Sequence, residues 1–387
     1  MPKDPASTNL PLKGLKVLEL ARILAGPWAR QILGDLGADV LKVESPGGDD
    51  TRSWGPPFID NGNGTQDAAY FHACNRGKRS ITADFGNDRD LEEVRSLAIE
   101  ADVVIENFKV GGLAKFGLDY ESLSALNPRL IYCSISGFGQ DGPYAARAGY
   151  DFIVQGLSGI MDLTGEPADA PQKIGVALAD IVTGLYAVIG IQAALTRRER
   201  TGQGDHVDVA LLDCMTGVLA NQAMNYLATR ENPARLGNAH PNIAPYAVFP
   251  AKDGWLILAV GNDGQFDRFC KVVGLDDLPA SPSFATNSSR VANRDALAAI
   301  ISAITQYWLR DELLGALESA TVPAGPINTV AQALTDPQIT ARGLVRRFDR
   351  ADAPPVEGIR TPLRFEHADL SLDCGSPLLG RDQPSWL

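Results

Sequence analysis

One acidic residue, Asp180, stands out because its neighbours are almost all apolar or small. From Ile174 to Thr196 the chain reads IGVALADIVTGLYAVIGIQAALT, with Asp180 as the single charged residue. Desolvating an unpaired carboxylate is costly, so this position favours a use for the charge. Two interpretations stay open: Asp180 is a reactive carboxylate, or it is the N-cap of a buried helix that begins at Ile181. They are compatible, because the helix dipole favours an ionised carboxylate at a cap.

A basic cluster and a glycine-rich loop are further candidates. Residues 75–79 read NRGKR, and three cations close together in an acidic chain suit a phosphate or pyrophosphate group. Asn107 and Phe108 follow an apolar run, and Lys115 comes shortly after them. Residues 136–142 read SGFGQDG, which fits a mobile loop over a ligand. The structural alternatives are a solvated basic loop, a core Phe108 and a plain turn.

Several catalytic signatures do not occur. The first predicted strand is followed by ARILAGPWARQILGDLG and not by GxGxxG. Glu44 ends the second predicted strand, where a ribose-binding acid often lies, so a nicotinamide-dependent dehydrogenase remains an alternative. The sequence contains no GxSxG, HExxH, Walker or CxxC pattern, and its four histidines lack metal-ligand spacing. We therefore expect neither a metal site nor a disulfide framework.

Short apolar runs and helical patterns alternate over the first 140 residues. Strands are expected at 14–20, 39–44, 101–107 and 129–136, with helices at 27–36 and 121–126. Because the runs show little polar alternation, each strand is expected to be buried on both faces. The pattern predicts a Rossmann-like, doubly wound parallel α/β sheet, which binds ligands at the carboxyl ends of its strands.

The length of 387 residues favours two domains. We expect a large domain at 1–220, a smaller α/β domain at 221–330, and an extended strap at 331–387 that returns to the large domain. The net charge of −12 argues against nucleic acid and anionic membranes as partners. The N-terminal sequence lacks the pattern of a secretion or transit signal, so a cytoplasmic protein is expected. A membrane span at 174–196 is not favoured, because the run includes a charge and three glycines.

Seven segments carry a resemblance that extends from about Leu12 to Gly380: LKGLKVLELARILAGPWARQILGDLGADVLKVE, NRGKRSITADF, ADVVIENF, SGFGQDGPYAARAGYD, LADIVTGLYA, RRERTGQGDHVDVALLD and VPAGPINTV. In this order they resemble the class III CoA-transferases, a family that also includes racemases of 2-methylacyl-CoA. The sequences DDTRSWGPPF and RAGYD resemble the branch that moves CoA from succinyl-CoA to dicarboxylates such as glutarate or hydroxymethylglutarate. The family fold, a large Rossmann-like domain plus a small domain, implies a homodimer whose two chains are interlocked as rings.

The resemblance also implies a mechanism. The family's nucleophile matches Asp180, which attacks the acyl-CoA carbonyl to give a mixed anhydride and CoA thiolate. The thiolate then attacks the aspartyl carbonyl and releases the acid, and an incoming carboxylate takes CoA through a second anhydride. A dry, apolar site slows hydrolysis of the anhydride. Coenzyme A is thus expected as a thioester substrate, with no permanently bound cofactor.

By the same matching, the adenosine and phosphate end of CoA is expected to contact Leu24, Ala25, Asn75, Lys78, Arg79, Asn107, Phe108, Lys115, Ser136 and Gly137. Some members carry an acyl-orienting glutamine where Leu24 stands, so the acyl pocket here differs from theirs. Backbone amides near Asp180 and in the loop that ends at Gln140 are expected to hold the developing oxyanions.

The motif Gly149-Tyr150-Asp151 separates two activities of the family. Racemases have a histidine where Tyr150 stands, and a phenol with a pKa near ~10 exchanges an α-proton poorly at neutral pH. CoA transfer is therefore favoured, and 2-methylacyl-CoA racemisation is the alternative. Tyr150 is expected to face the substrate, and Arg147 or His240 to pair with the distal carboxylate of a dicarboxylate acceptor. Carnitine or another monocarboxylate stays open as the acceptor.

Overall fold

The computed structural model describes residues 9–370 and 373–387. Its internal contacts divide the chain into two compact units. The first unit takes in the described residues up to Ile160, then Lys173–Met224 and Pro337–Leu387. The second unit consists of Met161–Gln172 and Asn225–Asp336. The chain therefore leaves the first unit and returns to it, and the short stretch Met161–Gln172 belongs with the second unit, although the sequence favoured the large domain for it.

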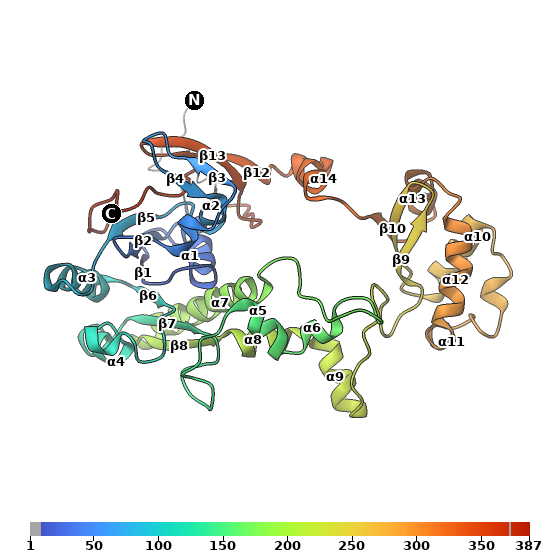
Figure 1. Cartoon of the computed structure of the whole chain (residues 1–387), viewed down its shortest axis with the longest axis horizontal. Helices are drawn as coiled ribbons and strands as arrows, with labels where there is room; N and C mark the ends of the chain where they lie inside the picture. Colours follow the sequence, from blue (N-terminus) through green and yellow to red (C-terminus); the bar gives the residue numbers. More distant parts are fainter. Residues whose placement is uncertain (1–8, 371–372) are drawn as a thin grey trace. The chain divides into compact units, whose positions relative to one another are not determined.

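A six-stranded sheet forms the centre of the first unit, with the strand order β5-β2-β1-β6-β7-β8 (Figure 1). All neighbouring strands pair in parallel. The strands are β1 (Lys16–Glu19), β2 (Asp39–Glu44), β5 (Arg79–Thr82), β6 (Val103–Glu106), β7 (Ile131–Ser136) and β8 (Asp205–Ala210). The predicted doubly wound parallel sheet is confirmed, and β5 and β8 extend it beyond the four predicted strands.

Both faces of this sheet are buried, as its apolar runs predicted. Val17 and Val103 point into one core, which the helices α1 (Ala25–Asp35) and α7 (Leu178–Thr201) cover. Their neighbours Leu18 and Val104 point into the opposite core, under α3 (Asp88–Glu100) and α4 (Tyr120–Leu126). Successive residues of a strand alternate between faces, so each strand fills two cores at once.

Helix α7 is long and apolar enough to cross a membrane by length and composition alone, and a third (33%) of its most apolar window is buried in this structure. It packs against α1, β7, β8, α5 (Asp151–Leu157) and α8 (Leu211–Val218) within the first unit. These contacts give α7 the place of a helix that covers a sheet, which accounts for its buried apolar side chains. Other apolar side chains of α7, among them Tyr186 and Ile189, are exposed.

The rest of the first unit surrounds the sheet with short elements: β3 (Phe58–Asp60), β4 (Gln66–Ala68), α2 (Ala69–Cys74), α15 (Pro337–Ala341), β12 (Val345–Arg350) and β13 (Ala353–Ile359). The C-terminal segment, predicted as an extended strap, thus contains the antiparallel hairpin β12–β13. This segment is hydrogen-bonded to the N-terminal part of the chain. Arg350 donates to the Asn61 side chain at 2.7 Å, and Ser80 N–H donates to Asp382 at 2.8 Å.

The second unit has a core of its own around a three-stranded antiparallel sheet, β11-β10-β9. Five helices, α10 to α14, belong to this unit among the described residues. The strands are β9 (Tyr246–Ala251), β10 (Gly254–Ala259) and β11 (Ala324–Pro326), and the helices are α10 (Asp263–Val273), α11 (Asn287–Ala292), α12 (Arg294–Thr305), α13 (Arg310–Ser319) and α14 (Val330–Thr335). Two helices lie where the units meet in sequence, α6 (Ile160–Leu163) and α9 (Ala220–Thr229).

Candidate active site

Asp180 lies in the first turn of α7, as the third residue of that helix. The alternative that Asp180 caps a helix starting at Ile181 is therefore wrong, because α7 begins three residues earlier, at Leu178. The residue in the N-cap position is Ala177, whose side chain cannot cap. The free amides of the first turn are instead satisfied from another part of the chain.

Asp151, the first residue of α5, supplies that partner. Its Oδ1 accepts from Ala179 N–H at 2.7 Å and from Asp180 N–H at 3.4 Å. Its Oδ2 accepts from Gln155 Nε2 at 2.7 Å, which fixes the orientation of the carboxylate. A carboxylate at a helix N-terminus is favoured by the helix dipole, so Asp151 stabilises the start of α7. The side chain of Asp180 is left free for another role.

The carboxylate of Asp180 has no hydrogen-bond or ion-pair partner among the residues that the structure describes. Burial, and then the negative charge of Asp151, raise the pKa of Asp180 to about 7. A carboxylate without partners in a poorly solvated place is destabilised relative to its protonated form, which makes the ionised form more reactive as a nucleophile. Perturbed acids of this kind cluster at functional sites.

The start of α1 lies against the first turns of α7. Gly184 makes this approach, since a Cβ at that position would lie 2.8 Å from the Ala25 carbonyl oxygen. Leu24 precedes α1 and gives it no side-chain cap, so backbone N–H groups of the first turn of α1 lack a capping side chain. Leu24 and Ala25 are thus brought close to the helix that carries Asp180, although the resemblance implied that they contact the adenosine and phosphate end of CoA.

Tyr70 is a neighbour of Asp180 that the sequence reasoning missed. It lies on α2, and its ring packs edge to face with Trp54 at 5.4 Å between centroids. Burial raises the pKa of Tyr70 to about 12, with further contributions from Asp180, Cys74 and Asp151. The Tyr70 hydroxyl therefore stays protonated over the physiological range and can donate a hydrogen bond. Only the pairing of two aromatic residues before the basic cluster marked this position in the sequence.

The glycine-rich loop after β7 lies beside the Asp151 segment. Gly137 and Gly149 are in close backbone contact, since a Cβ on Gly137 would lie 2.4 Å from the Gly149 Cα. The loop is ordered by two side chains: Ser136 Oγ accepts from Gly139 N–H at 2.8 Å, and Asp208 accepts from Gln140 N–H at 2.9 Å. The loop that follows Ser136 is therefore a fixed turn in this structure, which favours the simpler of the two predicted interpretations.

A cavity of about 330 Å³ opens at the carboxyl edge of the sheet. It lies where β1 has β2 on one side and β6 on the other, which is the switch point of a doubly wound sheet and the usual place for a ligand. Residues from the ends of β1, β2, β5 and β6 line it, among them Ala21, Arg22, Lys42, Phe85 and Phe108. The rings of Phe85 and Phe108 are stacked at 6.3 Å and give the cavity an aromatic wall suited to a base.

Part of the predicted phosphate site is already paired inside the protein. Lys78 Nζ contacts Glu19 at 3.0 Å, the Pro27 carbonyl oxygen at 3.0 Å and Asn75 Oδ1 at 2.8 Å. These contacts use the three donors of the ammonium group, and both Lys78 and Asn75 are buried. The structure therefore gives Asn75 and Lys78 roles in the core, and it does not support their predicted contact with phosphates.

Arg79 is also paired inside the protein, at the end of β5 that lies away from the cavity. Its guanidinium forms a bidentate pair with Asp39, from Nε to Oδ1 at 3.1 Å and from Nη2 to Oδ2 at 2.8 Å, and its Nη1 donates to the Ser385 carbonyl oxygen at 2.7 Å. Arg79 begins β5 and Asp39 begins β2, so the pair lies at the amino edge of the sheet. The predicted phosphate contact of Arg79 is not supported, because the cavity opens at the carboxyl edge.

Among the residues after β6, Phe108 lines the cavity, and Asn107 forms hydrogen bonds to the loop between β1 and α1. Asn107 Oδ1 accepts from Arg22 N–H at 3.0 Å, and its Nδ2 donates to the Arg22 carbonyl oxygen at 2.7 Å. Lys115 is exposed on a short 3-10 turn, and its ammonium lies 4.6 Å from the ring of Phe116. Lys115 does not line the cavity.

The predicted acceptor residues are spread over both units. Tyr150 is 62% exposed and directly precedes Asp151. Arg147 is exposed nearby, with its guanidinium 3.9 Å from the ring of Tyr144. His240 belongs to the second unit, where its Nδ1 accepts from Asn242 N–H at 3.1 Å and its ring packs on Tyr246. The contacts of these residues with a substrate stay predictions.

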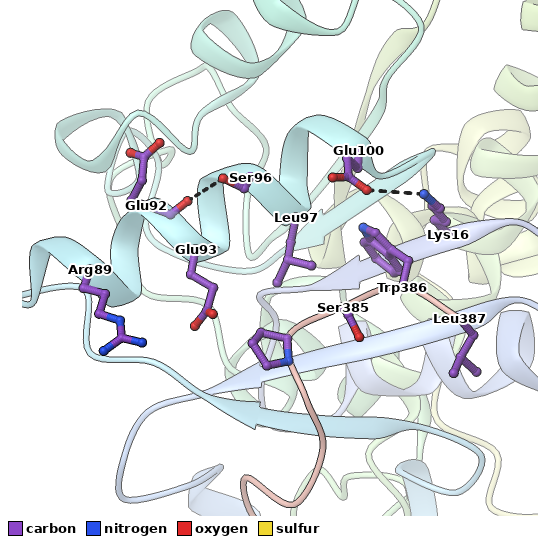
Figure 2. A pocket seen from close by; sticks show the side chains of 11 residues that line it. Lys16, Arg89, Glu92, Glu93, Ser96, Leu97, Glu100, Ser385, Trp386 and Leu387 are labelled. Carbon is purple, nitrogen blue, oxygen red and sulfur yellow. Dashed lines mark hydrogen bonds and ion pairs between the residues drawn. The ribbon is translucent and has the colours of Figure 1, made fainter.

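A different cavity, of about 760 Å³, lies between α3 and the C-terminal residues (Figure 2). Figure 2 shows Lys16 and Glu100 joined across it by an ion pair of 3.5 Å, with Trp386 beside them. Lys16 begins β1, so this cavity is at the amino edge of the sheet, away from the ligand-binding edge. None of the predicted site residues line it.

The comparison with known families decides which chemistry this arrangement serves. The family model for CoA-transferase family III matches residues 12–383. The chain belongs to CoA-transferase family III. A relative from Agrobacterium fabrum, named succinate–glutarate CoA-transferase, is 56% identical over 386 residues, which are 99% of this chain and 96% of the relative. Human succinyl-CoA:glutarate CoA-transferase is 40% identical over 384 residues, 98% of this chain and 86% of the human protein.

A solved structure agrees with this assignment. The crystal structure of a CAIB/BAIF family protein from Brucella suis is 64% identical and superimposes with a TM-score of 0.86, covering 96% of this chain and 97% of that one. The resemblance found in the sequence motifs, including its dicarboxylate branch, is confirmed. As a family III CoA-transferase, the chain is an enzyme that transfers coenzyme A, and it uses CoA thioesters as substrates. The relatives give no support to a nicotinamide-dependent dehydrogenase.

Proposed function

We propose that this CoA-transferase moves CoA from succinyl-CoA to a dicarboxylate, with glutarate as the first candidate, through an aspartyl-CoA thioester on Asp180. The names of the most similar relatives supply the substrates. The observation that carries the chemistry is the Asp180 carboxylate, which has no partner among the described residues and has its pKa raised to about 7. Such a group can attack an acyl carbonyl without first breaking interactions of its own.

Each step of the transfer then has a role for Asp180. Its carboxylate attacks the thioester carbonyl, so a C–O bond forms and the C–S bond to CoA breaks. The thiolate attacks the aspartyl carbonyl of this anhydride, which forms the aspartyl-CoA thioester and releases succinate. The acceptor carboxylate then attacks the aspartyl-CoA thioester, which forms a second anhydride and releases the CoA thiolate. The thiolate attacks the acceptor's carbonyl in this anhydride, which forms the new CoA thioester and regenerates the carboxylate of Asp180.

The oxyanions that form in these steps need hydrogen-bond donors. The Tyr70 hydroxyl and the uncapped amides at the start of α1, next to Leu24 and Ala25, are our candidates. Leu24 offers only its backbone for this purpose, because its side chain is apolar. For the acceptor, Arg147 and His240 remain candidates to pair with the distal carboxylate, and Tyr150 and Gln140 to contact the substrate.

One incubation tests both the intermediate and the acceptor. With succinyl-CoA alone, mass spectrometry is expected to find CoA on the tryptic peptide that runs from Ile174 to Arg197 and contains Asp180. Addition of glutarate is expected to remove the adduct and to produce glutaryl-CoA. A transfer that proceeds with no adduct in rapidly quenched samples contradicts the covalent step. An adduct that another dicarboxylate clears faster than glutarate changes the proposed acceptor.

We also infer a homodimer, because an apolar face of the first unit is uncovered. The helices α5 and α7 pack against each other and expose Phe152 (59%), Ile153 (49%), Tyr186 (48%) and Ile189 (62%). Large apolar side chains exposed on two packed helices are typical of an interface, and a second copy of this chain fits the interlocked dimer that the family resemblance implies. The cytoplasmic location and the absence of nucleic-acid and membrane partners stay predictions from the sequence.

The substitution Ile189→Asp tests this interface. Burial of one isoleucine contributes about 1.5–3 kcal/mol, and a two-fold axis counts it twice. We expect light scattering after gel filtration to give twice the mass of one chain for the wild type and a smaller dimer fraction for Ile189→Asp. Ser96→Asp, an exposed change on α3 over the opposite face of the sheet, is the control. A monomeric wild type would reject the inference.

A further inference from the structure

The loop between β1 and α1 has a strained backbone at one residue. Ile23 takes φ +73°, a left-handed conformation that is sterically costly for L-residues, above all for β-branched ones. A strained conformation persists only where its surroundings hold it, and such residues cluster at functional sites. The same loop walls the cavity of about 330 Å³ through Ala21 and Arg22. The strain therefore lies directly beside the candidate CoA site.

Side chains from distant segments hold this loop from both sides of Ile23. Lys42 Nζ donates to the Ala21 carbonyl oxygen at 3.0 Å. Asn107 pairs with both the N–H and the carbonyl of Arg22, at 3.0 and 2.7 Å. The loop backbone is thus bonded to β2 and to the turn after β6, the two neighbours of β1 in the sheet.

Asp49 makes the contact to the strained residue itself. Its two carboxylate oxygens each lie 3.3 Å from Ile23 N–H. The carboxylate also accepts from Lys42 Nζ at 2.9 Å, from Thr51 N–H at 3.0 Å and from Thr51 Oγ1 at 2.8 Å. Asp49 is only 4% exposed. All the groups around it are donors, so the side-chain amide of an asparagine would turn a donor toward another donor.

We propose that Asp49 is a positioning residue for coenzyme A, which holds Ile23 in its left-handed conformation so that the cavity is formed before the ligand binds. The proposal rests on the proposed function in taking CoA as the ligand of this cavity. A preformed site binds more tightly because ligand binding need not order the loop. The part of the loop that lines the cavity is Ala21 and Arg22, which lie before the amides proposed to hold the oxyanions. The loss of Asp49 is therefore expected mainly in KM and less in kcat.

The test is a set of kinetic measurements with a rescue. Asp49→Asn is expected to raise KM for succinyl-CoA about tenfold, with kcat within about threefold of wild type. Glycine reaches positive φ without a steric cost. Ile23→Gly in the Asp49→Asn background is therefore expected to return KM to within about threefold of wild type. Ile23→Gly alone is expected to change KM by no more than about threefold, because the clamp is intact.

A matched control separates positioning from simple loss of stability. Leu195→Ala empties space in the core on the other face of the sheet, which contains none of the residues that line the cavity, and it leaves the loop contacts in place. It is therefore expected to lower the melting temperature with KM unchanged. The Kd of CoA, measured by calorimetry for all four variants and the wild type, is expected to follow the same order as KM. This binding series tests the proposal even if the wild type transfers no acyl group from succinyl-CoA. An unchanged Kd in Asp49→Asn, a rise of KM in Leu195→Ala of equal size, or no recovery by glycine at position 23 would overturn it.

Discussion

Asp180→Asn is expected to lower kcat for CoA transfer by ~10⁴-fold or more, because the amide cannot form the mixed anhydride. The change is nearly isosteric, and Asp180 makes no side-chain contact among the described residues that asparagine would lose. Initial rates with succinyl-CoA and glutarate, followed by chromatography of the CoA esters, measure the effect. Glu199→Gln removes an exposed carboxylate near the other end of α7 and is expected to leave the rates unchanged.

The same variant has an expected effect on stability that distinguishes a lost nucleophile from a damaged fold. The pKa of Asp180 is raised from 3.8 to about 7, so the folded protein holds this proton more tightly than the unfolded chain. The contribution of Asp180 to stability is thus fully present below about pH 4 and is lost as the pH rises to about 7. Asp180→Asn removes this loss, so at pH 8 it is expected to be at least as stable as the wild type, by ~4 kcal/mol at most. A variant that is inactive and also much less stable at pH 8 would contradict the assignment.

The pH dependence of kcat/KM for the CoA donor is expected to show the ionisation of Asp180. Only the carboxylate is a nucleophile, so kcat/KM is expected to fall tenfold per pH unit below about pH 7, roughly 100-fold by pH 5. Asp151→Asn removes the neighbouring negative charge and is expected to move the inflection to lower pH. Because burial is the larger cause of the raised pKa, the inflection is expected to stay above the ordinary range of an aspartate.

One control variant completes this experiment. Glu199→Gln is expected to leave the inflection where the wild type has it. An inflection that does not move in Asp151→Asn would mean that the Asp151 charge does not act on the group that titrates. The amide at position 151 can still accept from Ala179 N–H, so α7 keeps its start.

Much of the fold follows from the sequence because it depends on local patterns. The apolar runs around β1, β2, β6 and β7 contain little alternation, and the structure buries each of them on both faces. The C-terminal segment was harder to predict, since the hairpin β12–β13 has short strands with charged residues and prolines. Its residues pair with positions hundreds of residues away, as with Arg350 and Asn61, and no local pattern predicts such contacts.

The candidate site shows the same division. Asp180 could be singled out because a charge in an apolar run is a local signal, whereas its relation to Asp151 joins residues 29 positions apart. The cap interpretation, one of the two left open for Asp180, was wrong because it placed the helix start at the nearest acid in the sequence. The sequence likewise showed no partner for the cation of Arg79, so a phosphate contact was predicted. In the structure Arg79 is paired with Asp39, which lies 40 residues earlier. The role proposed for Tyr70 depends on residues far away in the sequence, such as Asp180 and Asp151, and no local pattern indicates it.

The order in which the chain visits its two units has a consequence for biosynthesis. Residues 225–336 form most of the second unit without interruption, so they can fold soon after they leave the ribosome. The first unit must wait, because its hairpin β12–β13 and the residues that bond to Arg79 and Ser80 are translated last. A nascent chain stalled before Pro337 would hold Asp180 but would lack the pieces that close its unit, which makes it a natural client for chaperones during synthesis.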